Sequence, residues 1–284
     1  MATLREIKRR IDSVKSTQQI TKAMKMVAAA KLRKAQKQLY DTRPFSDELF
    51  DIISRIFSLP SGKDHPYFEQ RKPNKTCYVL ITADRGLCGG FNSNLIRAAR
   101  KSLLKSKVKN PRLLTIGKKG YDFFRKSDIR VAGKYTEFFG KLSLQDAIKI
   151  TGVLIEKFEK KQLDRIYIVY NEFLSVAHQD ITVSQFLPII PKEQAEEPAT
   201  AMLEPHPHKI LQQLVPMTLQ YQMFRMLLES YTAEQSARMT AMETAAENAD
   251  EMIKKLVLYY NKARQAAITT ELTEIVSGVE ALKG

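Results

Sequence analysis

The 284-residue sequence has no tryptophan and only two cysteines, Cys77 and Cys88. The cysteines stand eleven positions apart, with no CxxC spacing and no neighbouring histidine. This spacing argues against a zinc site and against a disulfide framework, both of which need more cysteines or closer ligands. We therefore expect two buried free thiols and no bound metal.

Long apolar runs are also missing. No stretch approaches the roughly 18 consecutive apolar residues that a membrane-spanning helix requires. The opening MATLREIKRRIDSVK has no apolar core of the kind found in signal peptides. We expect neither a transmembrane helix nor a signal peptide, and a chain that is made and kept in the cytosol. Apolar residues make up 44% of the sequence, which is enough for one large domain or two modest ones.

Acidic residues are scarce at the N-terminal end. Residues 1–40 contain eleven Lys or Arg and two Asp or Glu, whereas residues 205–284 contain eight and nine. The net charge of the whole chain is +15, so the middle supplies the remaining +7. Such a balance favours an anionic partner, which could be nucleic acid, an anionic membrane or an acidic protein.

The N-terminal segment has a helical pattern. Apolar residues recur at steps of three and four, pause at a polar Gln-Gln pair and then resume. We expect one long amphipathic helix that continues past Pro44, with a kink or break there, and stops at Pro60–Gly62. Its apolar positions are Leu4, Ile7, Ile11, Val14, Met24, Val27, Ala28, Leu32, Ala35 and Leu39.

The middle of the chain changes to a strand-like period. Strands are predicted at 77–81, 112–116, 128–135, 165–173 and 181–189, with helices that begin near Asn92, Lys118 and Leu142. This alternation predicts an α/β layered sheet that is mostly parallel, with the last two strands as a hairpin. Residues 188–208 carry five prolines and are expected to form a loop.

The C-terminal segment contains a sustained heptad seam, at Ala249, Ile253, Leu256, Tyr260, Ala263, Ala267 and Thr270. A helix of about 75 residues would be on the order of 110 Å long and could not bury this seam against a compact core. The economical partner is the N-terminal helix, in an antiparallel coiled coil. We predict coiled-coil helices at 1–60 and 205–284, with a Rossmann-like α/β domain at 61–204 inserted between them.

The stretch ITADRGLCGGFNSN, residues 81–94, raises the alternative of a nucleotide-dependent enzyme. Its glycines read G-x-x-G-G, which matches neither the dinucleotide fingerprint nor the phosphate-binding loop. Glycines after a strand also permit positive φ and close packing of helix on sheet. No nucleophile stands near a recognisable base, and the His206–His208 pair falls among prolines. We therefore expect no cofactor and no catalytic residues.

A second alternative is a coiled coil that binds nucleic acid, because the calculated pI is 9.6 and the first helix is basic. Such a protein would be expected to carry basic residues on both helices. The last eighty residues instead have a net charge of −1. The charge distribution thus argues against a nucleic-acid partner.

Three motifs together resemble the gamma subunit of the F-type ATP synthase in its bacterial form. They are ITKAMKMVAAAKLRKAQ at 20–36, ITADRGLCGGFNSN at 81–94 and YYNKARQAAITTELTEIVSGVEAL at 259–282. They occur in the order found in that family and span nearly the whole chain. The resemblance implies an antiparallel coiled coil of the two termini with a Rossmann-like domain at its foot.

The resemblance also implies a role and partners. Gamma subunits are single-copy rotor shafts inside a hexamer of alpha and beta subunits, and their foot binds the epsilon subunit and the membrane ring of c subunits. Rotation couples proton flow to ATP chemistry on the beta subunits, so the shaft itself is not catalytic. The expected location is the cytoplasmic side of the cell membrane, as a peripheral part of the complex. No nucleic-acid partner is implied.

The same resemblance implies two sets of contact residues. Basic residues of the N-terminal helix would face an acidic loop of each beta subunit, and polar residues of the C-terminal helix would contact other beta loops. The first set is Lys22, Met24, Lys25, Lys31, Arg33 and Lys34. The second set is Arg264, Gln265, Thr269, Glu271 and Glu274. Tyr259, Tyr260 and the methionines between 217 and 242 are expected to pack inside the coil.

Overall fold

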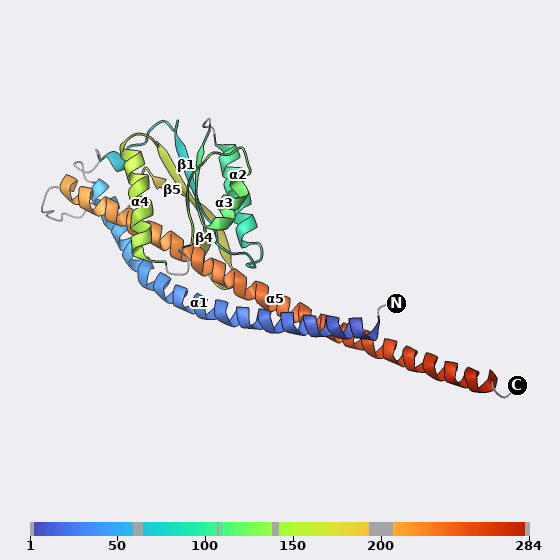
Figure 1. Cartoon of the computed structure of the whole chain (residues 1–284). Helices are drawn as coiled ribbons and strands as arrows, with labels where there is room; N and C mark the ends of the chain where they lie inside the picture. Colours follow the sequence, from blue (N-terminus) through green and yellow to red (C-terminus); the bar gives the residue numbers. More distant parts are fainter. Residues whose placement is uncertain are drawn as a thin grey trace. The chain divides into compact units, whose positions relative to one another are not determined.

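The computed structural model describes residues 3–58, 65–106, 108, 110–137, 142–192 and 207–281 (Figure 1). The predicted stop at Pro60–Gly62, residue His206 and most of the proline-rich loop lie outside the described residues. The chain forms two compact units. The coiled-coil unit comprises residues 1–28 and 239–284, and the α/β unit comprises residues 29–238. The division into 1–60, 61–204 and 205–284 stays a prediction.

Two long helices contribute to both units. They are α1 (Leu4–Ser58) and α5 (Pro207–Ala281). Helix α1 is continuous through Pro44, so the break that the proline allowed does not occur. None of the described helices has a stretch apolar enough to span a bilayer.

A five-stranded sheet forms the centre of the α/β unit. Its strands are β1 (Thr76–Ile81), β2 (Arg112–Ile116), β3 (Val131–Tyr135), β4 (Arg165–Phe173) and β5 (Gln179–Leu187). The order is β3-β2-β1-β4-β5, with the first four strands parallel and β4–β5 antiparallel. The predicted mixed sheet and its terminal hairpin are therefore confirmed.

Helices cover both faces of this sheet. Figure 1 shows α2 (Phe91–Lys105) and α3 (Lys118–Phe124) on one side and α4 (Leu144–Glu159) on the other. Helix α2 buries Phe91, Leu95, Ala99 and Leu103, one residue per turn. This spacing gives the helix one apolar stripe toward the sheet, as expected for a helix that packs on one layer.

Within the α/β unit, α1 and α5 run antiparallel and pack together. The rings of Phe45 and Tyr221 meet edge to face, with their centroids 4.5 Å apart. Over residues 227–236, all of α5 except Tyr231 is buried, although this stretch includes Glu229, Glu234 and Gln235. A helix buried on all sides must find internal partners for each polar group.

The two cysteines are buried free thiols, as predicted, with 3% of Cys77 and 1% of Cys88 exposed. Burial raises the pKa of the Cys77 thiol to about 11, because the charged thiolate is costly away from water. Burial also raises the pKa of Cys88. Both thiols are therefore poor nucleophiles in the folded chain.

Gly117, which follows β2, has no space for an added Cβ atom. Its φ is +93°, and a Cβ atom placed on it would lie 1.9 Å from the carbonyl oxygen of Thr82. The Gly117 N–H donates to the carbonyl of Tyr135 at 2.7 Å. Only glycine fits here, because a side chain would collide with backbone that β-sheet pairing holds in place.

We expect Gly117→Ala to lower the free energy of unfolding by at least about 2 kcal/mol, through positive φ and the clash with Thr82. The matched control is Gly152→Ala in α4, where an added Cβ would meet nothing within 4 Å. That change should raise the stability by about 0.5–1 kcal/mol. Urea unfolding followed by circular dichroism measures both; equal effects would contradict this account.

Candidate partner-binding surface

The coiled-coil unit is held together by a seam on each helix. On α1 the buried positions are Ile7, Ile11, Thr21 and Ala28, and on α5 they are Met242, Ala246 and Ala249. The α5 seam continues as partly covered side chains at Ile253, Leu256, Tyr260, Ala263 and Ala267. The heptad prediction is confirmed up to Ala267, whereas Thr270 is exposed.

Two polar contacts set the antiparallel alignment of this coil. Lys25 Nζ lies 2.5 Å from Glu243 Oε1, and Gln18 Nε2 donates to Asp250 Oδ1 at 3.2 Å. Asp250 also accepts from Lys254 Nζ at 2.8 Å. The hydrogen bond from Lys254 makes the larger contribution and that from Gln18 the smaller one, and both lower the pKa of Asp250. Gln18 and Thr21 thus occupy the seam of α1 where its apolar pattern is interrupted.

Helix α5 extends beyond its partner. Both polar contacts join positions whose numbers add to 268, which places Leu4, the first residue of α1, opposite Arg264. Residues 268–280 are accordingly exposed throughout, and Figure 1 shows the C-terminal end of α5 past the N-terminus. We call residues 268–281 the overhang.

The overhang carries an uncovered apolar stripe, at Ile268, Leu272, Ile275, Val276 and Val279. Leu272 is 58% exposed and Ile275 is 62% exposed. The stripe keeps the 4-3-4 spacing of a coiled-coil seam but has no partner helix within the described chain. The sequence carried this signal, but our heptad prediction stopped at Thr270.

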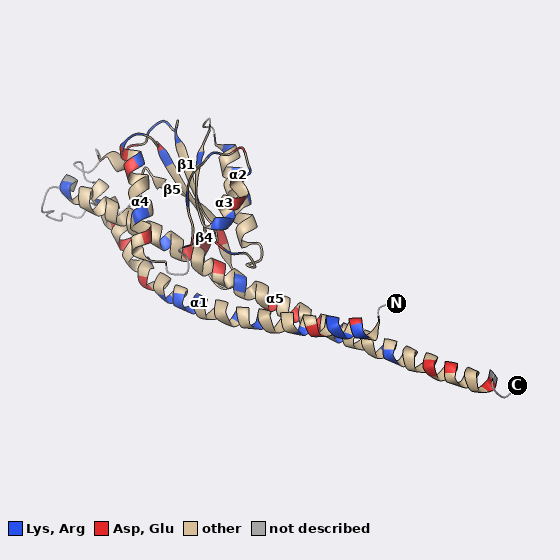
Figure 2. Cartoon of the chain, viewed as in Figure 1, with Lys and Arg blue, Asp and Glu red and all other residues tan. Residues whose placement is uncertain are grey.

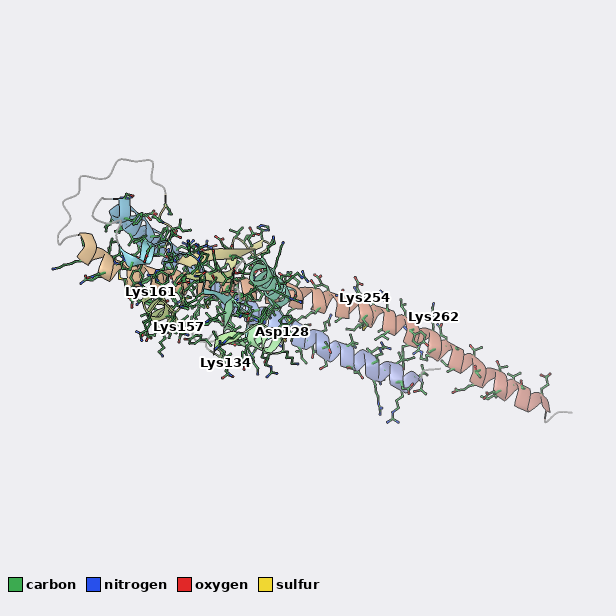
Figure 3. The ribbon with its side chains drawn as sticks, turned by 90° about the horizontal axis from the view of Figure 1, so that it is seen from above. Asp128, Lys134, Lys157, Lys161, Lys254 and Lys262 are labelled. Atoms are coloured by element: carbon green, nitrogen blue, oxygen red, sulfur yellow. The ribbon has the colours of Figure 1, made fainter. Side chains whose placement is uncertain are left out.

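The predicted contact residues of α5 all lie at the surface. Arg264, Gln265, Thr269, Glu271 and Glu274 are exposed, and no ion pair engages the three charged ones among the described residues. The Thr269 hydroxyl donates to the Gln265 carbonyl at 2.9 Å, which fixes its rotamer. Side chains along this helix, among them Lys254 and Lys262, project outward in Figure 3. The residues are thus accessible to a partner.

The predicted contact residues of α1 are distributed between the two units. In the coiled-coil unit Lys22 is exposed, whereas Met24 and Lys25 are partly covered, Lys25 by its contact with Glu243. In the α/β unit Lys31, Arg33 and Lys34 are exposed. Five further exposed cations near the N-terminus were not singled out from the sequence: Arg5, Lys8, Arg9, Arg10 and Lys15.

Two smaller predictions need correction. Val27 is 55% exposed and Tyr259 is 52% exposed, so neither packs in the seam. Both sit next to a true seam position, Ala28 and Tyr260, and helical rotation turns them about 100° away from the partner. The steps of three and four alone did not decide which of two adjacent apolar residues faces inward.

The glycine turn after β1 uses its polar groups within the chain. The Asp84 carboxylate accepts from the N–H groups of Lys118 at 2.9 Å and Glu137 at 3.1 Å. The Asn92 side chain accepts from the Ala83 N–H at 2.9 Å. Positive φ occurs at Leu87 and Gly89. These contacts hold the turn against neighbouring parts of the same chain.

Helix α5 anchors the same turn. Arg238 donates to the Gly86 carbonyl at 3.2 Å and pairs with Glu234 at 2.5 Å. Burial raises the pKa of Glu234, and the charge of Arg238 opposes that shift. An arginine of the chain itself is thus bonded to the backbone of the glycine turn.

The family described as ATP synthase matches residues 3–282. The ATP synthase gamma chain of Geobacter metallireducens is 43% identical over 288 residues, with all of both chains covered. The chain belongs to the ATP synthase gamma chain family. Gamma chains from Geobacter sp. strain M21 and Desulforamulus reducens are 45% and 42% identical over the full length of both chains.

Solved structures share the fold of this gamma chain family member. A chain of the Euglena gracilis mitochondrial ATP synthase rotor, in rotational state 1, matches with a TM-score of 0.67 and 20% identity, covering 93% of this chain and 98% of that one. A chain from the central stalk and c-ring of the Tetrahymena thermophila mitochondrial ATP synthase has a TM-score of 0.62 and 24% identity, covering 80% and 99%.

These comparisons confirm the family that the three motifs indicated. As a gamma chain, the protein is a component of ATP synthase. The nucleic-acid-binding alternative gains no support from them. The contact residues on α1 and α5 stay a prediction.

We expect Lys25→Ala to lower the free energy of unfolding by less than about 1 kcal/mol, since exposed ion pairs contribute little. Ile11→Ala, at a seam position that is 7% exposed, should cost about 2–4 kcal/mol. Urea unfolding of the full-length chain compares the two. A loss with Lys25→Ala as large as that with Ile11→Ala would show that Lys25 serves the coil rather than a partner.

Proposed function

We propose that this gamma chain is the rotating, non-catalytic shaft of a proton-translocating ATP synthase. One copy would stand inside a hexamer of alpha and beta subunits, with ATP chemistry on the beta subunits. The α/β unit would bind the epsilon subunit and the c ring, at the cytoplasmic face of the cell membrane. Family membership supports this role, and so does the surface of the coil.

The observation that carries the proposal is the charge difference between the two helices of the coil. Over residues 3–28, α1 has seven basic residues and two acidic ones. Over residues 239–281, α5 has four basic residues and seven acidic ones. Figure 2 marks the basic and acidic positions of both helices on the ribbon. The coil is therefore electrostatically lopsided around its own axis.

A lopsided shaft can distinguish three chemically equal neighbours. In a ring with threefold repetition, each beta subunit would meet a different side of the coil, so each would be biased toward a different conformation. Rotation of the shaft would move this bias around the ring. A symmetric shaft would contact all three subunits alike and could shift none of them relative to the others.

The exposed residues supply the contacts that such a bias needs. Lys22, Lys31, Arg33 and Lys34 would meet an acidic loop of a beta subunit, with Met24 beside them. Lys25 would leave its ion pair with Glu243 and pair with that acidic loop instead. The cost in free energy would be small, since the Lys25–Glu243 pair is exposed. On α5 the set would be Arg264, Gln265, Thr269, Glu271 and Glu274, in which the arginine fork can hold a carboxylate at two points.

The overhang favours an enclosed position for the tip of α5. Exposure of its five apolar side chains to water is unfavourable in free energy, and a surrounding ring of subunits would cover them. Rotation within such a ring requires contacts that can slide, and apolar contacts are non-directional.

The first test is co-expression with the alpha and beta subunits of the same organism. We expect one copy of this chain per three copies of each, with ATPase activity in the purified complex and none in the isolated chain. Native mass spectrometry gives the composition, and a coupled assay gives the activity. A monomeric product with its own turnover would overturn the proposal.

The second test is the double substitution Arg264→Ala with Gln265→Ala. We expect the ATPase activity of the complex to fall about threefold or more, because charge-assisted contacts to the beta subunits are lost. Stability of the isolated chain should not change, since both side chains are exposed. The matched control is Lys262→Ala, an exposed cation two residues away. An equal loss with Lys262→Ala would reject the assigned contacts.

A further inference from the structure

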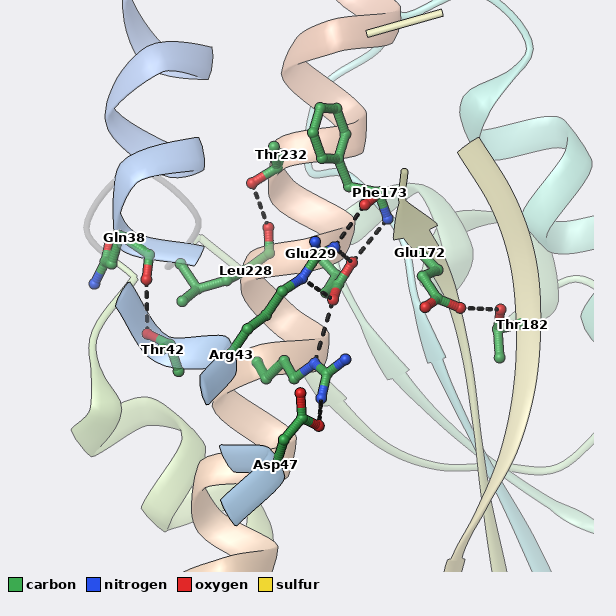
Figure 4. A network of polar contacts seen from close by, with 11 residues as sticks. Gln38, Thr42, Arg43, Asp47, Glu172, Phe173, Thr182, Leu228, Glu229 and Thr232 are labelled. Atoms are coloured by element: carbon green, nitrogen blue, oxygen red, sulfur yellow. Dashed lines mark hydrogen bonds and ion pairs between the residues drawn. The ribbon is translucent and has the colours of Figure 1, made fainter. Parts of the chain in front are cut away.

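A buried group of charges in the α/β unit takes no part in the contacts proposed above. Glu229 of α5 has a side chain only 1% exposed, yet it is surrounded by donors (Figure 4). Its Oε1 accepts from Arg43 Nε at 3.0 Å and Arg225 Nε at 3.3 Å. Its Oε2 accepts from Arg43 Nη2 at 2.9 Å and from the Phe173 N–H at 2.8 Å.

The same group closes the end of a strand. Strand β4 makes its last pair with β1 at Val169 and continues to Phe173 without that neighbour. Arg43 Nη2 donates to the Phe173 carbonyl at 2.6 Å while Glu229 accepts the Phe173 N–H. The two side chains thus satisfy both backbone groups of Phe173, as a neighbouring strand would.

A second contact joins the two helices beside this point. Asp47 lies one turn after Arg43 on α1, and its carboxylate pairs with Arg225, one turn before Glu229 on α5. Arg43, Asp47, Phe173, Arg225 and Glu229 together form what we call the Glu229 clamp. It ties α1, α5 and β4 to one another.

Stability alone does not require such a group. Apolar residues of similar volume commonly replace a buried ion pair at no loss of stability, because desolvation of the charges offsets their attraction. Apolar packing is non-directional, however, and resists separation better than sliding or twisting. Hydrogen bonds have preferred angles and lengths. Four N–H donors from α1, α5 and β4 on one carboxylate therefore fix how these three elements are rotated relative to one another.

We propose that the Glu229 clamp is the positioning element that makes the helix pair twist together with the sheet, so that torque passes between them without angular loss. The inference rests on the proposed rotor function. Within that function, loss of the clamp would leave assembly and ATP chemistry in place and would make the connection between helices and sheet torsionally softer.

The test measures torsional stiffness directly. The complex with alpha and beta subunits is fixed to a surface by its hexamer, and a bead is attached through K101C, at an exposed position of α2. The native thiols Cys77 and Cys88 are buried and should not compete for the label. The angular variance of the bead is recorded while the motor waits for ATP.

Two variants and one control are compared with the K101C parent. Glu229→Gln keeps the shape of the side chain but replaces one carboxylate oxygen with an NH₂ group, which cannot accept from the N–H donors that face it. Arg43→Lys keeps the charge and compensates Glu229, so it should fold, but it lacks the planar fork. The control Leu228→Ala shortens an apolar side chain on the same helix that is 1% exposed and makes none of the hydrogen bonds of the clamp.

We expect Glu229→Gln and Arg43→Lys to raise the angular variance about twofold or more, because directional contacts are lost. Leu228→Ala should leave it unchanged although it destabilises the chain. Variance equal to that of the parent in both clamp variants would overturn the clamp and leave the rotor function intact. An equal rise with Leu228→Ala would also overturn it. A parent complex that does not rotate would overturn the rotor function, and the clamp with it.

Discussion

In the coiled-coil unit neither long helix can bury its apolar stripe against a compact core, and this constraint brings the two ends of the chain together. A stripe that recurs at seven-residue intervals along several turns needs a partner with the same repeat. Small side chains at Ala28, Ala246 and Ala249 let the helices approach closely, and the polar pairs Lys25–Glu243 and Gln18–Asp250 set their alignment. A shift of one turn would separate both polar pairs at once.

In the α/β unit the same two helices meet a different constraint, because α5 is enclosed there rather than paired along one side. Several polar side chains in the enclosed stretch are bonded to the chain itself. The Thr232 hydroxyl donates to the Leu228 carbonyl at 2.7 Å, and Ser236 donates to the Val176 carbonyl at 2.8 Å. The first bond lies within the helix, whereas the second reaches the loop after β4 and constrains the position and rotation of the helix there.

Periodicity alone predicted most of the fold. The predicted strand at 165–173 coincides with β4, and the predicted 181–189 is displaced by two residues from Gln179–Leu187. Strand propensity and turn residues are local signals, so one sequence is enough to read them. The need for glycine at position 117 was not predicted. Gly117 lies outside the glycine-rich stretch, and the backbone that leaves no space for a side chain belongs to Thr82, 35 positions earlier.

The candidate site was predictable in part for the same reason. Composition shows that the first helix is basic, but the lysines and Arg264 were named only because three motifs resemble the gamma subunit. The Glu229 clamp could not be predicted, because it joins residues from three distant segments and none of them has a local motif. Glu229 looks like any helical surface glutamate until its burial and its donors are known.

The glycine turn shows how an α/β sheet can keep its form without holding a nucleotide. In open sheets of this kind, ligands bind outside the carboxyl ends of the strands where the order reverses, which here is between β1 and β4. Helix α5 occupies that edge: Glu229 bonds the end of β4, Ser236 the turn after it, and Arg238 the Gly86 carbonyl. The edge of the sheet where related folds bind a ligand is therefore covered in this chain by its own C-terminal helix.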